Sequence, residues 1–243
     1  MIFTLSQAKS MVAKTLTALI ILMLFSVSLQ ADETQLIEPV RPFVSRVVHS
    51  LESLPSERKE MLTTITDYIV EQIERGDNAK LVFVCTHNSR RSHLSQVWCS
   101  TAAAYYEVPH IETYSGGTEA TACNIRTVRA LRRSGLSVVA STEGDNPVYL
   151  VQYSEKMPSI RAYSKVYFEE GNPSSDFAVM LCCSDADKKC PVVEGSDSRF
   201  ALHYEDPKIA DNTPEESKRY DERSLQIARE MFFVMSEVSK RIH

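Results

Sequence analysis

The sequence has 243 residues, of which 43% are hydrophobic and 24% are charged. That length suits one domain of ordinary size with additions. The formal net charge of −5 argues against a general nucleic-acid-binding protein, which usually carries a basic patch. No internal repeat or low-complexity tract divides the sequence, so we expect a single folded domain.

Residues 1–31 predict a secretory signal peptide. A basic start with Lys9 and Lys14 is followed by the apolar run "TLTALIILMLFSVSLQA" and then by the acidic "DETQ". The apolar run is short for a membrane span, which needs about 20 residues. An uncleaved N-terminal membrane anchor is the alternative. In both cases we expect the remaining chain to lie outside the cytoplasm, as an exported periplasmic or secreted protein.

Residues 32–78 predict a helical N-terminal extension that precedes the first strand. Ser56 is a suitable N-cap and Gly76 a suitable stop for a long helix in this segment. Its apolar side chains recur at helical spacing on one face: Leu62, Ile65, Ile69 and Ile73. The extension is therefore expected to pack as an added helix against the main domain.

Residues 79–243 predict a three-layer α/β sandwich around a central parallel sheet, because strands alternate with helices. Thr213, Pro214 and Glu216 have the pattern of a capping box at the start of the last helix. The strands are expected at 80–85, 110–117, 136–141 and 176–183, and the helices at 91–106, 124–135 and 213–243.

Residues 146–173 break the alternation. They contain two β-rich runs around "SEKMPS", which predict an inserted β-hairpin. Two interpretations stay open for it: a simple extension of the sheet edge, or a flap or partner surface that serves function.

The stretch "LVFVCTHNSRRSHLSQVW" contains the candidate active-site residues. A buried strand ends on Cys85, and a short polar loop leads into a helix that carries Arg91. This geometry points several backbone N–H groups at one spot, which binds an oxyanion and favours the thiolate form of a cysteine there. Arg91 is spaced to grip two anion oxygens as a fork. Asn88 can hold the loop in shape, and Ser92 can donate to the thiolate. The alternative is that Cys85 is only a small buried residue that packs at a strand end and has no chemical role.

The sequence contains six cysteines, Cys85, Cys99, Cys123, Cys182, Cys183 and Cys190. An exported protein often uses cysteines for structural disulfides. Cys85 and the pair Cys182–Cys183, however, each end an apolar run, where the catalytic residues of α/β folds collect. We therefore expect reactive thiols at these positions.

These motifs in order resemble the low-molecular-weight protein tyrosine phosphatase superfamily, and most of all its thioredoxin-coupled arsenate reductases. "VCTHNSRRSHLSQ" is similar to the phosphate loop, "YSGGTEATACNIRTVRALRRSGL" to the segment that follows it, "MLCCSDADKKCPVV" to the redox segment, and "HYEDPKIADNTPEE" to the Asp-Pro loop. The resemblance runs from about Lys80 to the C-terminus and is interrupted by residues 146–173.

The resemblance implies a role for each matching residue. Cys85 becomes the nucleophile, Arg91 the oxyanion clamp and Asp206, held before Pro207, the general acid that protonates the leaving oxygen. The alternative for Asp206 is that it only forms an ordinary Asp-Pro turn. The remaining oxyanion-binding residues implied by the loop match are Thr86, His87, Asn88, Ser89, Arg90 and Ser92.

The cysteines separate two possible reactions. A phosphatase lets water hydrolyse the cysteinyl-phosphate, whereas a reductase uses further thiols. "CSDADKKC" places Cys183 and Cys190 seven residues apart, as in the reductases, so the resemblance implies that Cys183 attacks Cys85 and Cys190 then captures Cys183. Cys182 is interpreted as strand packing, with a substitute resolving thiol as the alternative. An ordinary surface disulfide between Cys183 and Cys190 also stays open.

Some positions depart from the family pattern. Lys208 stands where the phosphatases place a substrate-stacking Tyr, which weakens the case for an aryl phosphate. Gln96 stands where some reductases place a cation-binding Glu, so the resemblance implies no potassium site here. We expect no other metal site, because no second ligand pair accompanies Cys183 and Cys190, and no bound cofactor. The expected partners are a small oxyanion or phosphate-ester substrate and an external thioredoxin-like reductant. A phosphatase and a non-catalytic anion-binding or redox-sensing module remain the alternatives to an arsenate reductase.

Overall fold

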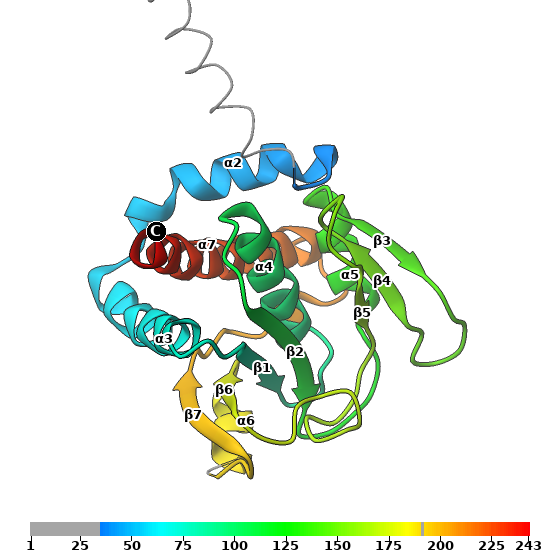
Figure 1. Cartoon of the computed structure of the whole chain (residues 1–243). Helices are drawn as coiled ribbons and strands as arrows, with labels where there is room; N and C mark the ends of the chain where they lie inside the picture. Colours follow the sequence, from blue (N-terminus) through cyan, green and yellow to red (C-terminus); the bar gives the residue numbers. More distant parts are fainter. Residues whose placement is uncertain (1–34, 191) are drawn as a thin grey trace, which may run out of the picture.

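A four-stranded parallel sheet with the strand order β2-β1-β6-β7 forms the centre of the molecule (Figure 1). The computed structural model describes residues 35–190 and 192–243. The sheet strands are β1 (Ala79–Cys85), β2 (Ile111–Gly117), β6 (Phe177–Leu181) and β7 (Ser196–Ala201). The central strands β1 and β6 are almost wholly apolar and buried, as expected for strands covered on both faces. The predicted α/β fold with a central parallel sheet is confirmed.

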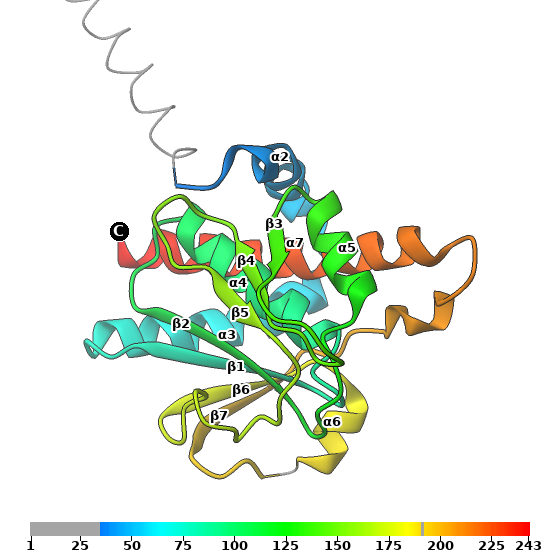
Figure 2. The ribbon, with the colours of Figure 1, turned by 90° about the vertical axis from the view of Figure 1, so that its right-hand side faces the viewer.

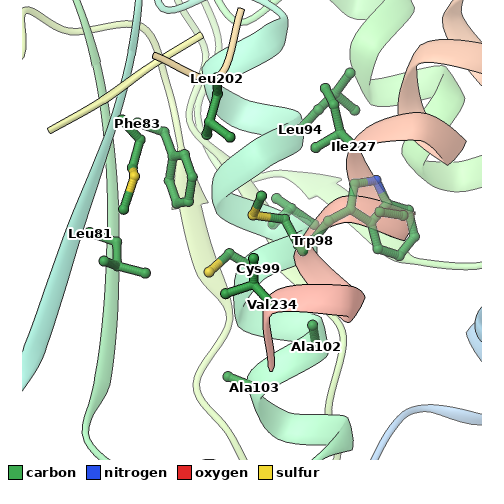
Figure 3. Packing of buried hydrophobic residues seen from close by; sticks show 14 of the residues in the cluster. Leu81, Phe83, Leu94, Trp98, Cys99, Ala102, Ala103, Leu202, Ile227 and Val234 are labelled. Atoms are coloured by element: carbon green, nitrogen blue, oxygen red, sulfur yellow. The ribbon is translucent and has the colours of Figure 1, made fainter. Parts of the chain in front are cut away.

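Helix α4 (Arg91–Tyr105) lies between the sheet and the last helix, α7 (Glu216–Ile242). Figure 3 shows Phe83 of β1, Leu94 and Trp98 of α4 and Ile227 of α7 in one continuous core. The indole N–H of Trp98 donates to Ser224 Oγ of α7 at 2.9 Å. The packing of α4 against β1 and α7 fixes the start of α4 relative to the end of β1. The loop predicted to bind an oxyanion lies between these two points.

The segment before β1 is helical, as predicted. It contains α3 (Ser56–Glu74), which packs on α7, and α2 (Arg41–His49), with two short 3-10 turns, η1 (Glu38–Val40) and η2 (Leu51–Ser53). Helix α3 begins on Ser56 itself, so its N-cap is Pro55 and the predicted cap was one residue late. Gly76, with φ +82°, ends the helix as predicted.

A second, antiparallel sheet with the order β3-β4-β5 stands beside the central one (Figure 2). Its strands are β3 (Ser137–Ala140), β4 (Tyr149–Gln152) and β5 (Ile160–Ala162). The β4–β5 pairing confirms the inserted hairpin. The assignment of residues 136–141 to the central sheet was wrong, because β3 pairs with β4. Only Val138 of β3 is buried, and such a strand cannot lie within a sheet covered on both faces.

Three further differences concern short or polar segments. Strand β7 was not predicted, because its inward and outward residues alternate in a polar sequence. The short helices α6 (Ser184–Lys189) and η3 (Pro207–Ala210) were also missed. Helix α7 begins at Glu216, later than the predicted cap at Thr213. The Glu216 carboxylate accepts instead from the backbone N–H of Asn212 at 2.7 Å. The remaining helix, α5 (Ile125–Arg133), begins after Asn124, whose side chain caps it.

The predicted signal peptide, residues 1–31, lies outside the described residues. Within residues 35–190 and 192–243, every helix is too short or too polar to cross a membrane. The same described residues hold no cluster of three or more His, Cys, Asp or Glu side chains suited to a metal ion.

Candidate active site

The loop of residues 86–90 joins the last residue of β1, Cys85, to the first residue of α4, Arg91. Its carbonyl oxygens accept hydrogen bonds from outside the loop: Thr86 O from Glu119 N at 2.8 Å, His87 O from Ser164 Oγ at 2.8 Å, and Ser89 O from Asn124 N at 3.0 Å. Because C=O and N–H point in opposite directions across a peptide plane, the following N–H groups face the interior of the loop. Among the hydrogen bonds of the described chain, none is donated by a backbone N–H of residues 86–90. These N–H groups are the kind that hold an anion.

Gly117, at the end of β2, makes this loop geometry possible. A Cβ at this position would lie 2.7 Å from the backbone nitrogen of Asn88 and 2.3 Å from Glu119 O. Both separations are too short for a side chain. The residue must therefore be glycine, because the backbones of Asn88 and Glu119 approach it closely. Gly117 therefore lets the loop pack directly against the end of β2.

Asn88, the middle residue of the loop, fixes the loop's shape through its backbone and its side chain. Its backbone is in the left-handed region, with φ +44°, which Asn adopts more readily than most residues. Its side chain is fully buried; Nδ2 donates to Ser92 Oγ at 2.8 Å, and Oδ1 accepts from the backbone N–H of Lys165 at 3.0 Å. One amide thus ties the loop to α4 and to the segment after β5.

Ser92 Oγ lies 3.1 Å from Cys85 Sγ. Because the hydroxyl oxygen already accepts from the Asn88 amide, its own hydrogen is free to point at the sulfur. Cys85 is 3% exposed, at the floor of the loop. The chain Asn88–Ser92–Cys85 therefore supplies a hydrogen bond that stabilises negative charge on this sulfur.

Arg91 and Asp206 meet beside the loop. Arg91 Nη2 donates to Asp206 Oδ2 at 2.8 Å, and Nη1 donates to Tyr204 O at 3.0 Å. The Nε–H of Arg91 is buried and has no partner among the described residues. Asp206 caps η3 by accepting from Lys208 N at 3.0 Å, which orients the carboxylate. The sequence-predicted clamp and general acid are thus in direct contact.

The Arg90 side chain has a different surrounding from the rest of the loop. Its Nε donates to the hydroxyl of Tyr220 at 2.7 Å, and its Nη2 donates to Asp211 at 3.2 Å. Tyr220 in turn donates to Asp211 Oδ1 at 2.8 Å, and these interactions raise the pKa of Arg90 against the effect of burial. Sequence reasoning missed Tyr220 and Asp211, since neither belongs to a local motif. They anchor the end of the loop to α7.

The inserted hairpin reaches the loop through the residues that follow β5. Besides the Lys165 contact to Asn88, Ser164 Oγ donates to His87 O, and Asn146 pairs with the Ser164 backbone in both directions. Gly117 N donates to Lys165 O at 2.8 Å. The insertion therefore braces the loop, and it adds one parallel bridge, between Val166 and Gly117, to the edge of the central sheet.

A buried histidine, His93, sits on the first turn of α4 against the same segment. Its Nε2 donates to Tyr163 O at 3.2 Å. Burial, together with the nearby Lys165 ammonium, lowers the pKa of His93 to about 4. Burial also lowers the pKa of Lys165. The imidazole is consequently neutral at physiological pH.

The thiols divide between two sides of the site. Cys183 Sγ lies 3.6 Å from Thr86 Oγ1, at the N-cap of α6, and Cys190 lies at the C-cap of the same helix. Burial raises the pKa of Cys190. Cys182 Sγ is instead 3.6 Å from Ser95 Oγ of α4. All six cysteines are free thiols in this structure.

A cavity of about 710 Å³ opens beside the loop. Its walls come from the loop, the start of α5, the approach to β4 and the Asp-Pro segment. They include His87, Ser89, Cys123, Tyr149 and Lys208. Lys208, which departs from the phosphatase pattern, therefore faces a space large enough for an organic group.

The fold and the loop define a class: an α/β protein with a cysteine at a strand end, a turn with inward-facing backbone N–H groups and an arginine at the start of the next helix. Curated proteins of similar sequence are arsenate reductases. Arsenate reductase 2 of Staphylococcus epidermidis is 27% identical over 131 residues, covering 54% of this chain and 80% of that protein. The arsenate reductase of Bacillus subtilis is 26% identical over 147 residues, covering 60% and 87%. No family model matches the chain.

Similar solved structures are low-molecular-weight phosphatases. The phosphotyrosine phosphatase of Vibrio cholerae O395 has a TM-score of 0.45 and 10% identity, and a tyrosine phosphatase of Bacillus subtilis has 0.46 and 15%. Each match covers 68% of this chain and 99% of the solved chain. The sequence relatives confirm the predicted resemblance to arsenate reductases. The relatives are enzymes, in agreement with the prediction that this chain is one.

Proposed function

We propose that this protein reduces arsenate to arsenite through a relay of Cys85, Cys183 and Cys190. The observation that carries the proposal is the position of Cys183 Sγ, 3.6 Å from Thr86 Oγ1 and so directly beside the first residue after Cys85. A phosphatase has no use for a thiol at this position. The arsenate-reductase relatives support the same choice.

The first step is attack of the Cys85 thiolate on arsenate. The inward N–H groups of the loop and the free Nε–H of Arg91 bind the oxyanion, and Ser92 stabilises the thiolate before attack. A sulfur–arsenic bond forms, an arsenic–oxygen bond breaks, and Asp206 protonates the leaving oxygen as water. For this Asp206 must arrive protonated, and it must exchange its contact with Arg91 for one with the substrate.

The second step is reduction. Cys183 attacks the sulfur of Cys85, a disulfide forms, and the electron pair of the sulfur–arsenic bond remains on arsenic as arsenite departs. Cys190 then attacks Cys183, which frees Cys85 as a thiolate and leaves a Cys183–Cys190 disulfide. An external dithiol protein of the thioredoxin type reduces that disulfide and becomes oxidised itself.

Helix α6 must unwind for the last transfer. Cys183 and Cys190 lie at its two ends, about 10 Å apart along the axis at 1.5 Å per residue. A disulfide needs Cα atoms within about 7 Å. The helix has only six residues, so its unwinding breaks few hydrogen bonds.

The test is arsenite release by the purified full chain supplied with thioredoxin, thioredoxin reductase and NADPH. Cys85→Ser, Cys183→Ser and Cys190→Ser should each abolish sustained arsenite release. Cys99→Ser, a buried thiol elsewhere on α4, is the matched control and should retain it. Sustained turnover by Cys183→Ser and Cys190→Ser would contradict the relay.

A phosphatase acting through a cysteinyl-phosphate is the second candidate, because the cavity beside the loop has room for the organic group of a phosphate ester, although none of Cys85, Arg91 and Asp206 lines it. Hydrolysis of p-nitrophenyl phosphate that survives Cys183→Ser but is lost in Cys85→Ser supports this reaction. Binding of phosphate without turnover in either assay would indicate an anion-binding or redox-sensing module instead.

We also propose that the protein acts after export, on the strength of the sequence of residues 1–31. Cell fractionation with mass spectrometry of the mature N-terminus tests this. Recovery of the intact chain from the cytoplasm would contradict it.

A further inference from the structure

Cys182 lies opposite Cys85 on the neighbouring strand. Val84 of β1 pairs with Leu181 of β6, and Cys182 N donates to Val84 O at 2.7 Å, so Cys85 and Cys182 are the next pair in the parallel register. Neighbouring strands lie about 4.8 Å apart. A disulfide joins Cα atoms about 4.4–6.8 Å apart. The two backbones are therefore already at disulfide distance.

The two side chains also lie on the same face of the sheet. Cys85 Sγ contacts Ser92 Oγ at 3.1 Å, and Cys182 Sγ contacts Ser95 Oγ at 3.6 Å. Ser92 and Ser95 are one turn apart on α4, so both sulfurs lie beneath the start of that helix. Burial raises the pKa of Cys182, and the neighbouring Cys85 raises it further.

Cys183 lies on the other side. Successive residues of an extended chain point in opposite directions, and Cys183 Sγ contacts Thr86 Oγ1 rather than α4. Cys183 also occupies the N-cap position of α6, away from the buried residues beneath α4 that enclose Cys182. The adjacent cysteines thus present one thiol to the α4 side of Cys85 and one to the loop side.

We propose that Cys182 is a second disulfide partner of Cys85, used when peroxide oxidises the nucleophile. Peroxide converts the Cys85 thiolate to sulfenic acid, releasing hydroxide. The Cys182 thiol then displaces the hydroxyl, forming the Cys85–Cys182 disulfide and one water. A small dithiol reduces this disulfide back to the two thiols by exchange and is itself oxidised to a disulfide. The inference rests on Cys85 being the reactive thiol of the proposed function.

The disulfide would be sheltered. Cys182 has no exposed surface and Cys85 only 3%, so a reductant reaches this bond only from the mouth of the loop. A bound oxyanion covers the same mouth. We therefore expect inorganic phosphate to slow both formation of the disulfide by peroxide and its reduction.

The test uses the full-length Cys183→Ser/Cys190→Ser double variant, which removes the relay thiols and leaves Cys182 in place. After treatment with one equivalent of hydrogen peroxide and alkylation, non-reducing peptide mapping should find Cys85 joined to Cys182. Dithiothreitol should restore the free thiols. Adding Cys182→Ala should eliminate this cross-link and leave Cys85 as a sulfenic acid, which further equivalents of peroxide oxidise to sulfinic and then sulfonic acid.

Cys99→Ala in the same double variant is the matched control, because Cys99 is also a buried thiol in contact with the core of α4. It should leave the cross-link unchanged. Irreversible oxidation of Cys85 in the double variant, or a cross-link that survives Cys182→Ala, would overturn the proposal. Arsenite release by the wild-type chain is measured separately, so failure of the relay and failure of this inference are distinguishable.

Discussion

Asn88 and Lys165 join the loop of residues 86–90 to the inserted hairpin: the backbone N–H of Lys165 donates to Oδ1 of Asn88 at 3.0 Å. The two residues are 77 positions apart in the sequence. The contact makes the shape of this loop depend on a segment that the family resemblance does not cover. The insertion is therefore part of the site's supporting structure.

Asn88→Ala should weaken oxyanion binding and lower the free energy of unfolding by about 2–6 kcal/mol. The change leaves the buried Lys165 N–H unpaired and removes the donor to Ser92, and each such loss costs about 1–3 kcal/mol. Phosphate binding by calorimetry and urea unfolding measure the two effects.

Asn88→Gly separates the loss of the side-chain hydrogen bonds from the backbone strain that alanine suffers at this position. Gly accepts the positive φ of this residue at no steric cost but makes neither side-chain bond. It should be more stable than Asn88→Ala and equally weak in phosphate binding. Wild-type affinity in both variants would show that the Asn88 amide does not shape the loop.

Gly117→Ala should displace the loop. The added Cβ would meet backbone atoms of Asn88 and Glu119 at under 3 Å, and neither can move without the loop. Overpacking of this kind costs about 1–3 kcal/mol. We expect phosphate affinity to fall at least tenfold while the circular dichroism spectrum stays native.

Gly144→Ala is the matched control for that variant. Gly144 has φ +103° and open space around its Cβ position, so alanine there suffers backbone strain without touching the loop. It should lose some stability and retain phosphate binding. Equal loss of binding in both variants would count against a steric role for Gly117.

Arg91→Lys should bind oxyanions poorly although the charge is kept. Lysine lacks the planar fork and the Nε–H, so it cannot offer two parallel donors to one anion. The buried Nε of Arg91, unpartnered among the described residues, is the donor at issue. Phosphate affinity should fall by roughly tenfold to a hundredfold, which corresponds to losing one or two charge-assisted hydrogen bonds.

Arg133→Lys tests whether any arginine would give the same result. Arg133 is a surface residue of α5 that pairs with Asp221 of α7 at 2.7 Å. Its replacement should leave phosphate affinity unchanged. An Arg91→Lys variant that binds as tightly as Arg133→Lys would remove Arg91 from the oxyanion site.

The parts of the site that sequence predicts are those built from contiguous residues. The run from β1 through the loop to α4 was predicted because a buried strand, a polar loop and an amphipathic segment follow one another directly. Asp206 was predicted because the Asp-Pro pair is local. Its contact with Arg91, across 115 positions, was not predicted; the family resemblance implied only that Asp206 acts at the same site.

The parts that sequence did not predict depend on tertiary contacts. Nothing around Tyr220 marks it as the residue that holds Arg90, and only the packing of α7 beside the loop brings them together. Strand β3 was assigned to the wrong sheet because "LSVVAS" has strand propensity whichever partner it takes. Strand β7 was missed because its alternating pattern contains a single large apolar residue, Phe200.

His93 predicts a pH dependence of stability. Its pKa is about 4 in the folded protein and near 6.5 when unfolded, so between these values the unfolded chain binds a proton that the folded chain does not. The stabilisation is present in full above about pH 6.5 and is lost as the pH falls toward 4. At pH 5 the free energy of unfolding should be lower by about 2 kcal/mol, because His93 is then largely protonated in the unfolded chain and still largely neutral in the folded one.

Urea unfolding at pH 7.5 and pH 5.0, in wild type and His93→Gln, measures this effect. Glutamine can still donate to Tyr163 O but cannot be protonated, so its stability should fall less between the two pH values. The carboxylates titrate in both proteins and cancel in the comparison. Because Lys165 faces His93, Lys165→Met should raise the His93 pKa and shrink the wild-type difference. Identical pH profiles for wild type and His93→Gln would mean that the buried imidazole does not govern acid stability.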